Sequence, residues 1–338
     1  MMRIIGLDIG GANLKASDGE RASVSQPYPL WQRVDTLGDA LGTLLSGFDT
    51  FDAVAVTMTG ELADCFATKS EGVSRILAAV MTATGRPVHV WQTSGEFVAP
   101  EVAIEFPRLT AAANWHALAT WAGRMTPQGA ALLIDVGSTS SDVIPLNDGM
   151  PVPDGRTDLE RLLSGELVYT GVRRTPICAV TDAVPVGEQM CPLAAELFAT
   201  THDVALVLGD AEPDIDCRDT ADGRPATRDA ALARLARMVC CDITQLAEPQ
   251  LVAMAEFLRQ RQLESLTAAI DRVVASLPVS PRAVLLCGEG ESLARRALAA
   301  RSAPRLGEPF SLSNSLGPTH SQAACAFALA RLGRERLA

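Results

Sequence analysis

One short pattern occurs twice in the chain, and it limits the possible folds more than any other feature of the sequence. Residues 6–10 read Gly-Leu-Asp-Ile-Gly, and residues 133–137 read Leu-Ile-Asp-Val-Gly. Each copy ends an apolar stretch that stops at a small-residue turn and resumes as a second strand. Superimposing the copies places Asp8 on Asp135 and Lys15 on Asp142. The repeat therefore predicts two lobes of related topology.

Strand and helix patterns alternate along the rest of the chain. Helical periodicity covers residues 36–45, 73–84, 114–121 and 229–241, and apolar strand patterns cover residues 53–58, 87–91, 204–208 and 283–287. Such alternation is typical of a mostly parallel sheet with helices on both faces. We expect an α/β protein with lobes at residues 1–126 and 127–338 around a cleft, and an acidic loop near residues 210–228 in the second lobe.

Composition narrows the class of protein further. The 338 residues are 48% apolar and carry a net charge of −11, which supports a large core and argues against a nucleic-acid or anionic-membrane surface. The apolar runs are too short to span a bilayer, and the N-terminus turns polar early, so we expect a cytoplasmic protein. The eight cysteines form no C-x-x-C pair, and no metal-thiolate site is predicted.

The two repeated turns are candidate phosphate sites. Glycines let a phosphate approach backbone N–H groups, and hydroxyl side chains donate to its oxygens. Two such turns in equivalent places would face one another across a cleft and hold one polyphosphate from both sides. The expected phosphate-binding residues are Gly10, Gly11, Asn13, Lys15, Gly137, Ser138, Thr139 and Ser140.

Carboxylates at the ends of these strands are candidate metal ligands. Mg²⁺ prefers oxygen ligands and is usually shared between carboxylates and substrate phosphates. We expect Mg²⁺ at Asp8, Asp135 and Asp142. Of the 29 basic residues only Lys15 and Lys69 are lysines, and a compact ammonium suits a phosphate as a point charge. Both lysines are therefore expected in the site.

Two further features are candidates for a flat nucleotide or ring slot. The turn with Gly288 and Gly290 follows an apolar strand where a helix begins, although a plain strand-to-helix connection explains it nearly as well. Asn114 and Trp115 can line the cleft, but the apolar helical spacing of Trp115 and Trp121 is more often core. We expect Asn114, Gly288 and Gly290 to form this slot.

Together the three turns resemble those of the actin-like, sugar kinase and heat-shock ATPase superfamily, which implies a duplicated ribonuclease H-like fold. A narrower resemblance, to the hydantoinase/oxoprolinase-related proteins of tetrahydromethanopterin-linked one-carbon transfer, rests on residues 57–66, 68–69, 71–73, 113–115 and 165–172. Archaeal members of that group join an aminomethylfuran-methanol diphosphate to γ-glutamyltyramine in methanofuran biosynthesis and release diphosphate. The resemblance implies a transferase with small-molecule diphosphate and tyramine-type substrates.

That implied reaction assigns roles to the remaining candidates. A phenol has a pKa near 10, so a carboxylate should help to remove its proton, and Glu61 or Asp64 is expected to do so with Lys69 nearby. A plain helix-capping role for Glu61 and Asp64 is almost as good an explanation. Arg173 and Arg174 can meet glutamyl carboxylates, although paired arginines in a loop are usually solvated. The alternative function is an ATP-dependent small-molecule kinase, with ATP or ADP in the same cleft. The sequence leaves the oligomeric state open.

Overall fold

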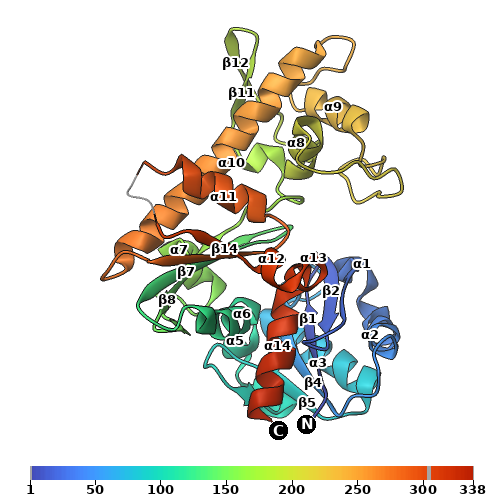
Figure 1. Cartoon of the computed structure of the whole chain (residues 1–338). Helices are drawn as coiled ribbons and strands as arrows, with labels where there is room; N and C mark the ends of the chain where they lie inside the picture. The colour runs from blue at the N-terminus through green and yellow to red at the C-terminus, as the bar shows by residue number, and fades with distance from the viewer. Residues whose placement is uncertain (1, 303–305, 338) are drawn as a thin grey trace.

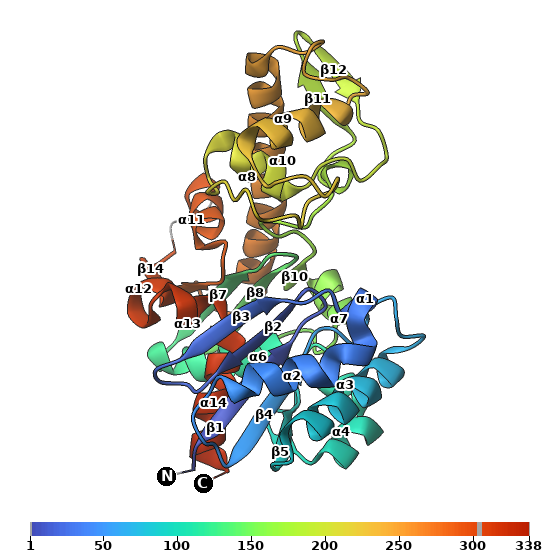
Figure 2. The same cartoon turned by 90° about the vertical axis from the view of Figure 1, so that its right-hand side faces the viewer.

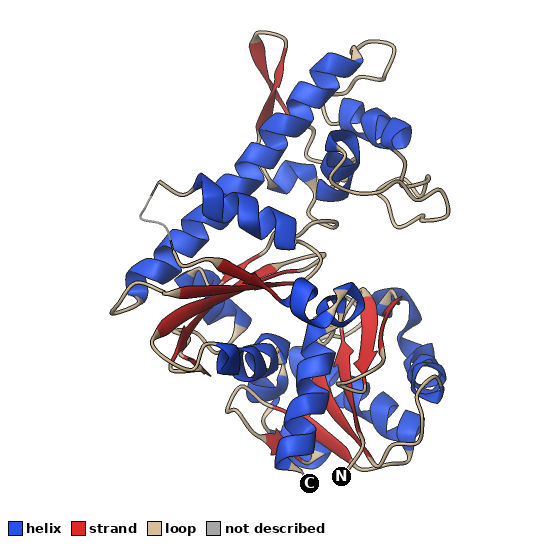
Figure 3. Ribbon diagram, viewed as in Figure 1, coloured by secondary structure: helices blue, strands red, loops and turns tan. Residues whose placement is uncertain are grey.

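The computed structural model describes residues 2–302 and 306–337, and two β-sheets with the same strand order form its framework (Figures 1 and 3). The first has the order β3-β2-β1-β4-β5-β6, and the second has the order β10-β8-β7-β13-β14. The central strand of the first sheet, β1, pairs antiparallel with β2 and parallel with β4. The central strand of the second sheet, β7, pairs in the same way with β8 and β13. This repeated order confirms the expected duplicated ribonuclease H-like α/β fold.

The strands follow the expected pattern closely. The first sheet contains β1 (Ile4–Ile9), β2 (Asn13–Ser17), β3 (Ser23–Pro27), β4 (Ala53–Met58), β5 (Val88–Trp91) and β6 (Phe97–Val98). The second contains β7 (Ala130–Val136), β8 (Ser141–Asn147), β9 (Met150–Pro151), β10 (Leu167–Val168), β13 (Ala283–Cys287) and β14 (Pro309–Ser311). The strands β1 and β4 are buried at every position, as strands covered on both faces must be.

Helices and sheets alternate as layers through the two lobes. The outer face of the first sheet packs on α2 (Leu37–Ser46) and α3 (Lys69–Thr84). The outer face of the second packs on the C-terminal half of α10 (Glu248–Ser276) and on α11 (Glu291–Ala300). Between the sheets lie α6 (Asn114–Ala122) and α14 (Ala324–Arg336), in one core that joins both lobes. The lobes are thus fixed to one another by shared apolar packing.

The C-terminal helix corrects the expected lobe boundary. The helix α14 crosses back and runs beside β1, so the first lobe contains residues from both ends of the chain (Figure 1). Gly6 permits this approach, because a Cβ there would lie 2.0 Å from the carbonyl oxygen of Ala326. A division at residues 126 and 127 therefore misplaces α14. Local sequence patterns do not report such a long-range contact.

A helical subdomain extends from the second lobe (Figure 2). It contains α8 (Thr201–Leu208), α9 (Arg228–Arg237), the N-terminal half of α10 and the hairpin of β11 (Ala183–Val186) and β12 (Gln189–Pro192), with its own apolar core. The strand predicted at residues 204–208 is wrong, because this segment is the second half of α8. All of residues 201–207 are buried, so the apolar run carries no helical periodicity. Gly209, with φ of 73°, ends the helix.

Short elements complete the connections. They are α1 (Leu30–Arg33), η1 (Val34–Thr36), α4 (Pro100–Glu105), α5 (Pro107–Thr110), η2 (Gly123–Met125), α7 (Asp158–Ser164), η3 (Ile177–Ala179), α12 (Leu312–Leu316) and α13 (Pro318–Gln322). Over the described residues, every helix is too short or too polar to cross a membrane.

Candidate active site

The two repeated turns have the same hydrogen-bond geometry. Across the β1–β2 hairpin Asp8 pairs with Lys15, and across the β7–β8 hairpin Asp135 pairs with Asp142. In the first turn the N–H of Gly10 donates to the carbonyl of Asn13 at 2.9 Å. In the second turn the N–H of Gly137 donates to the carbonyl of Ser140, also at 2.9 Å. The superposition predicted from the repeat is therefore present in the backbone itself.

Both turns are open enough to admit a ligand. Gly10, Gly11 and Asn13 are partly exposed, and so are all four residues 137–140 of the second turn. A Cβ on Gly11 would meet no atom of the described residues within 4 Å. A ligand oxygen can therefore come close to this backbone without displacing protein atoms.

The second turn is braced from behind by buried contacts. A Cβ on Gly171 would lie 2.5 Å from the backbone N of Thr139, so only glycine allows this segment to pack on the turn. The N–H groups of Arg173 and Arg174 both donate to the carbonyl of Ser138, at 3.0 and 2.9 Å. Gln262 of α10 donates to the carbonyl of Gly171 at 2.8 Å. The segment after β10 and the middle of α10 thus position the turn.

The charged groups at the two turns interact between the lobes. Asp8 is buried, and its pKa is raised chiefly by burial, with Lys15 acting in the opposite direction and Asp142 of the other lobe adding to the rise. Burial, Asp142 and Asp8 raise the pKa of Asp135 to about 6, against the effect of Lys15. The pKa of Lys15 is raised because nearby carboxylates outweigh its burial. The predicted face-to-face arrangement of the turns is supported by these couplings.

The residues fit a shared magnesium ion better than a protein-only metal site. Within residues 2–302 and 306–337 there is no group of three or more His, Cys, Asp or Glu side chains that could hold a metal by themselves. The buried Oδ1 of Asp8, however, has no hydrogen-bond partner in the described chain. Asp8 and Asp135 therefore offer the one or two carboxylates that Mg²⁺ uses when phosphate oxygens complete its shell.

Asp142 has a structural partner that the sequence analysis missed. Its carboxylate forms an ion pair with Arg161 of α7, whose Nη1 lies 2.9 Å from Oδ1 of Asp142. The side chain of Arg161 is only 1% exposed. The same guanidinium lies over the ring of Trp115 at 4.0 Å. Trp115 is therefore a core residue under Arg161, and Asp142 is neutralised by Arg161, which makes it a weaker candidate metal ligand than Asp8 or Asp135. Nothing in the local sequence of α7, in which Arg161 stands beside Asp158 and Glu160, indicates this pairing.

The turn with Gly288 and Gly290 packs directly on the C-terminal end of β7. A Cβ on Gly288 would lie 2.3 Å from Oδ1 of Asp135, and a Cβ on Gly290 would lie 2.3 Å from the side chain of Val136. Both glycines therefore have a packing role. Asn114 lies nearby, with its amide 3.7 Å from Sγ of Cys325, a thiol in electrostatic contact with Asp8 and Asp135. Asn114 thus lies beside Cys325, and the slot role of Asn114, Gly288 and Gly290 stays a prediction.

Glu61, Lys69 and Asp158 form a second charged group at the junction of the lobes. The Nζ of Lys69 lies 2.6 Å from Oδ2 of Asp158 and 4.0 Å from Oε1 of Glu61. Glu61 is 1% exposed, and burial raises its pKa to about 7 although Lys69 lowers it. Asp158 also acts on the pKa of Asp142, so this group borders the phosphate turns. Asp64, in contrast, is exposed.

Helix α3 explains why Lys69 is in this place. The helix begins at Lys69, four residues earlier than predicted, because Thr68 accepts from the N–H of Glu71 at 3.1 Å. Gly72 lies in the first turn of the helix, where a Cβ would be 2.1 Å from the carbonyl oxygen of Glu61. The helix start therefore packs against the Glu61 turn, and no helix begins at Glu61 or Asp64, which corrects the capping role considered for them.

Comparison with known proteins matches this chain to a family over most of its length. The family model described as Hydantoinase/oxoprolinase matches residues 52–335. The chain belongs to the hydantoinase/oxoprolinase family. The resemblance drawn from residues 57–66 and 165–172 is thus confirmed at the level of the family.

Two archaeal relatives share the name (4-{4-[2-(gamma-L-glutamylamino)ethyl]phenoxymethyl}furan-2-yl)methanamine synthase. The one from Methanocaldococcus jannaschii is 33% identical over 339 residues, which covers 99% of this chain and 98% of the relative. The one from Methanococcus vannielii is 32% identical over 168 residues, covering 49% of this chain and 74% of the relative. These hydantoinase/oxoprolinase relatives are named as enzymes.

Solved structures show weaker similarity. A nucleotide-free acetone carboxylase aligns with 94% of this chain at 13% identity and a TM-score of 0.49, and this chain spans 51% of that one. The archaeal actin homolog Ta0583 aligns with 99% of this chain and 100% of its own at 14% identity and a TM-score of 0.45. The fold assignment rests on the strand order of the two sheets, not on these scores.

Proposed function

We propose that this protein is an ether-forming transferase of methanofuran-type cofactor biosynthesis. It would condense an aminomethylfuran-methanol diphosphate with γ-glutamyltyramine and release diphosphate. The observation that carries the proposal is the pair of matched turns, with the charge of Lys15 coupled to those of Asp8 and Asp135, in a chain that is 33% identical over 99% of its length to a synthase named for that product. One cleft with two phosphate turns suits a diphosphate leaving group.

The bond changes in this reaction balance without an oxidant and without a nucleotide. The phenol oxygen forms a bond to the methylene carbon of the furan, and the bond from that carbon to the diphosphate oxygen breaks. The electron pair leaves with the diphosphate, and the phenol proton is taken by a base. The enzyme therefore has to stabilise negative charge on the leaving group and accept one proton.

Residues of the two turns would stabilise the leaving group. Lys15, held in its charged form by the surrounding carboxylates, would neutralise negative charge on the diphosphate. The turn N–H groups and the hydroxyls of Ser138 and Thr139 would donate to its oxygens. Asp8 and Asp135 would hold Mg²⁺, which supplies further neutralisation of the leaving diphosphate.

Glu61 is the better candidate for the base. It is buried, its pKa of about 7 lies near neutral pH, and it borders the phosphate turns through Asp158. A base of this pKa is partly ionised at pH 7 and accepts a proton more readily than an ordinary carboxylate. Asp64 is exposed and has no such environment. Lys69 would hold Glu61 and Asp158 together at the junction of the lobes.

Release of diphosphate tests the proposal. The purified protein is incubated with Mg²⁺ and the furan diphosphate, with and without γ-glutamyltyramine, and diphosphate is quantified by phosphorus NMR. Release that depends on both substrates and needs no ATP supports the transferase. Formation of ADP from ATP with an alcohol substrate, and no release from the furan diphosphate, would instead indicate a kinase.

A further inference from the structure

A polar cavity lies beside the phosphate turns, outside the group of residues described so far. It has a volume of ≈ 260 Å³ and lies between the helical subdomain and the start of α11. Its charged walls are three arginines and three acids, Arg173, Arg259, Arg296, Asp210, Glu212 and Glu289. Equal numbers of opposite charges suit a ligand that carries both signs.

The arginines of the cavity differ in how fully they are occupied. Arg296 binds both carboxylate oxygens of Asp210, with Nη1 at 2.8 Å and Nη2 at 2.5 Å. Arg259 is 7% exposed and gives one contact to Asp210 at 3.2 Å and one to Gln262 at 2.9 Å. Its Nε, although buried, has no hydrogen-bond partner within the described chain. Arg259 therefore lines the cavity with donor capacity that the described protein groups do not use.

Arg173 and Glu289 form an ion pair that a ligand can enter. The guanidinium of Arg173 binds the carboxylate of Glu289, and the two side chains are 42% and 30% exposed. An exposed pair of this kind is weakly held, so a ligand with its own carboxylate and ammonium can exchange partners with it. Glu289 also acts on the pKa of Lys15, so this end of the cavity adjoins the phosphate turns.

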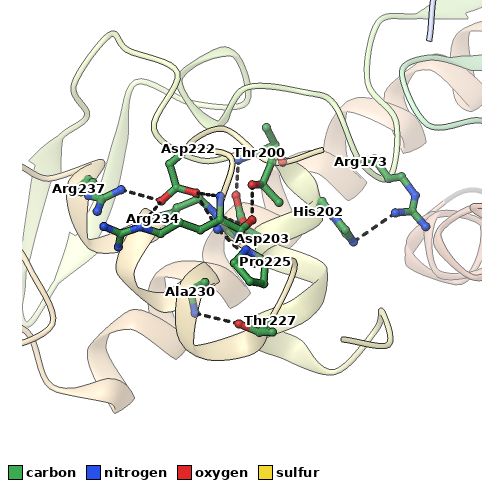
Figure 4. Close-up of polar contacts among 12 residues, drawn as sticks. Arg173, Thr200, His202, Asp203, Asp222, Pro225, Thr227, Ala230, Arg234 and Arg237 are labelled. Carbon is green, nitrogen blue, oxygen red and sulfur yellow. Dashed lines mark hydrogen bonds and ion pairs between the residues drawn. The ribbon is translucent and has the colours of Figure 1, made fainter. Parts of the chain in front are cut away.

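The wall near Arg173 is fixed by a buried network in the helical subdomain (Figure 4). Asp203 accepts from Nε of Arg234 at 2.7 Å and from the N–H of Thr200 at 2.9 Å, which anchors the start of α8. His202, the residue before Asp203, places Nε2 3.5 Å from Nη1 of Arg173. Burial and the nearby arginines lower the pKa of His202 to about 4, so its ring is neutral at pH 7 and adds no positive charge.

We propose that this cavity binds the zwitterionic α-amino acid head of a γ-glutamyl acceptor, with the α-carboxylate on Arg173 and Arg259 and the α-ammonium on Glu289. The inference rests on the proposed function for the acceptor's identity. Arg173 and Arg174, which the sequence suggested as a pair, have different roles in this proposal. Arg173 lines the cavity, whereas Arg174 stacks on the ring of Trp31 at 4.8 Å and does not line it. The phenol end of the acceptor would then point toward the phosphate turns.

Calorimetric binding to the whole protein tests the proposal with four acceptors. They are γ-glutamyltyramine, tyramine, N-glutaryltyramine without the amino group, and N-(4-aminobutanoyl)tyramine without the carboxylate. We expect γ-glutamyltyramine to bind at least about tenfold more tightly than each of the others, the usual effect of losing a charge-assisted hydrogen bond. Equal affinity for all four, or binding of adenosine with no binding of γ-glutamyltyramine, would overturn the proposal.

Two matched variants assign the contacts. Arg173→Ala should weaken the binding of γ-glutamyltyramine about tenfold and reduce its preference over N-(4-aminobutanoyl)tyramine, because only Arg259 then holds the carboxylate. Arg174→Ala, the adjacent arginine, should keep that preference, and a loss of preference in both variants or in neither would contradict the assignment. Because buried Arg259 can be needed for folding, Arg259→Lys is compared only after its melting temperature is shown to match the wild type.

Binding and ether formation, measured with the same acceptors, test the cavity assignment and the proposed reaction independently. Selective binding of γ-glutamyltyramine without formation of an ether would refute the reaction and support the cavity assignment. Ether formation with equal kcat/KM for tyramine and γ-glutamyltyramine would support the reaction and refute the cavity assignment.

Discussion

Lys69 of the first lobe lies 2.6 Å from Asp158 of the second lobe, and the same ammonium is 4.0 Å from the buried carboxylate of Glu61. This contact joins two helix starts, those of α3 and α7, that are 89 residues apart in sequence. It places one candidate base at the junction of the lobes, next to the turns that would hold diphosphate.

Glu61 should control the pH dependence of turnover. Its pKa of about 7 means that the ionised form, which acts as the base, is lost as the pH falls through 7. We expect kcat to fall about tenfold for each pH unit below that value. In Glu61→Gln this limb should be absent and kcat about 10²-fold to 10⁴-fold lower, the usual contribution of a general base. A full-rate Glu61→Gln enzyme, or an unchanged pH profile, would remove Glu61 from the mechanism.

The same carboxylate should affect stability with a defined sign. Because its pKa is raised in the folded protein above the ordinary 4.5, the folded state binds the proton more tightly than the unfolded state. The free energy of unfolding therefore falls as the pH rises from about 4.5 to about 7 through this group. Urea unfolding of wild type and Glu61→Gln at pH 5 and pH 8 measures this. We expect the variant to gain stability relative to wild type at pH 8, and a relative loss there would contradict the assignment.

The two phosphate turns should be indispensable for turnover but not for folding. Lys15→Ala and Asp8→Asn remove a charge that acts on the leaving group, and we expect losses of about 10²-fold to 10³-fold in kcat. Melting temperature and circular dichroism should stay near those of the wild type. Arg21→Ala, which removes an exposed cation from the β2–β3 turn at the opposite end of the first sheet, is the control. If either site variant keeps the wild-type rate, the cleft does not bind the diphosphate.

The repeat allowed much of this centre to be predicted from the sequence. Asp8, Lys15, Asp135 and Asp142 occupy equivalent positions because strand alternation and a glycine turn fix hairpin register locally. The pairing of Asp142 with Arg161 could not be predicted, since α7 reaches it through tertiary packing. For the same reason the crossing of α14 to the first lobe was missed. The segment 204–208 was misassigned because a helix buried on all sides has no periodicity.

Gly171 should be intolerant of any side chain. Its Cβ would lie 2.5 Å from the backbone of Ser138 and Thr139, so Gly171→Ala must displace the second phosphate turn. We expect the KM for the furan diphosphate to rise about tenfold and stability to fall by about 1–3 kcal/mol, as for other overpacked sites. Gly42→Ala in α2 is the control, because its Cβ would meet the nearest described atom at 3.9 Å. If the two substitutions have the same effect, the close approach of Gly171 does not position the turn.

Arg161 should be a large contributor to stability. It is buried between Asp142 and the ring of Trp115, so Arg161→Met leaves the carboxylate of Asp142 without its partner. Removing one member of a buried pair costs about 3–5 kcal/mol, and we expect a loss of this size in urea unfolding. The double variant Arg161→Met/Asp142→Asn should recover part of it, because the unpaired charge is then gone. A single-variant loss below about 1 kcal/mol would show that the pair is not a significant stabiliser.

The most direct test of the account follows one oxygen atom through the reaction. γ-Glutamyltyramine carrying ¹⁸O in its phenol is incubated with the protein, Mg²⁺ and the aminomethylfuran-methanol diphosphate, without ATP. The ¹⁸O content of each product is then measured by mass spectrometry. We expect all of the label in the ether and none in the released diphosphate, because the phenol oxygen attacks the methylene carbon of the furan. Label in a phosphate ester of the phenol, or no ether unless ATP is added, would contradict it.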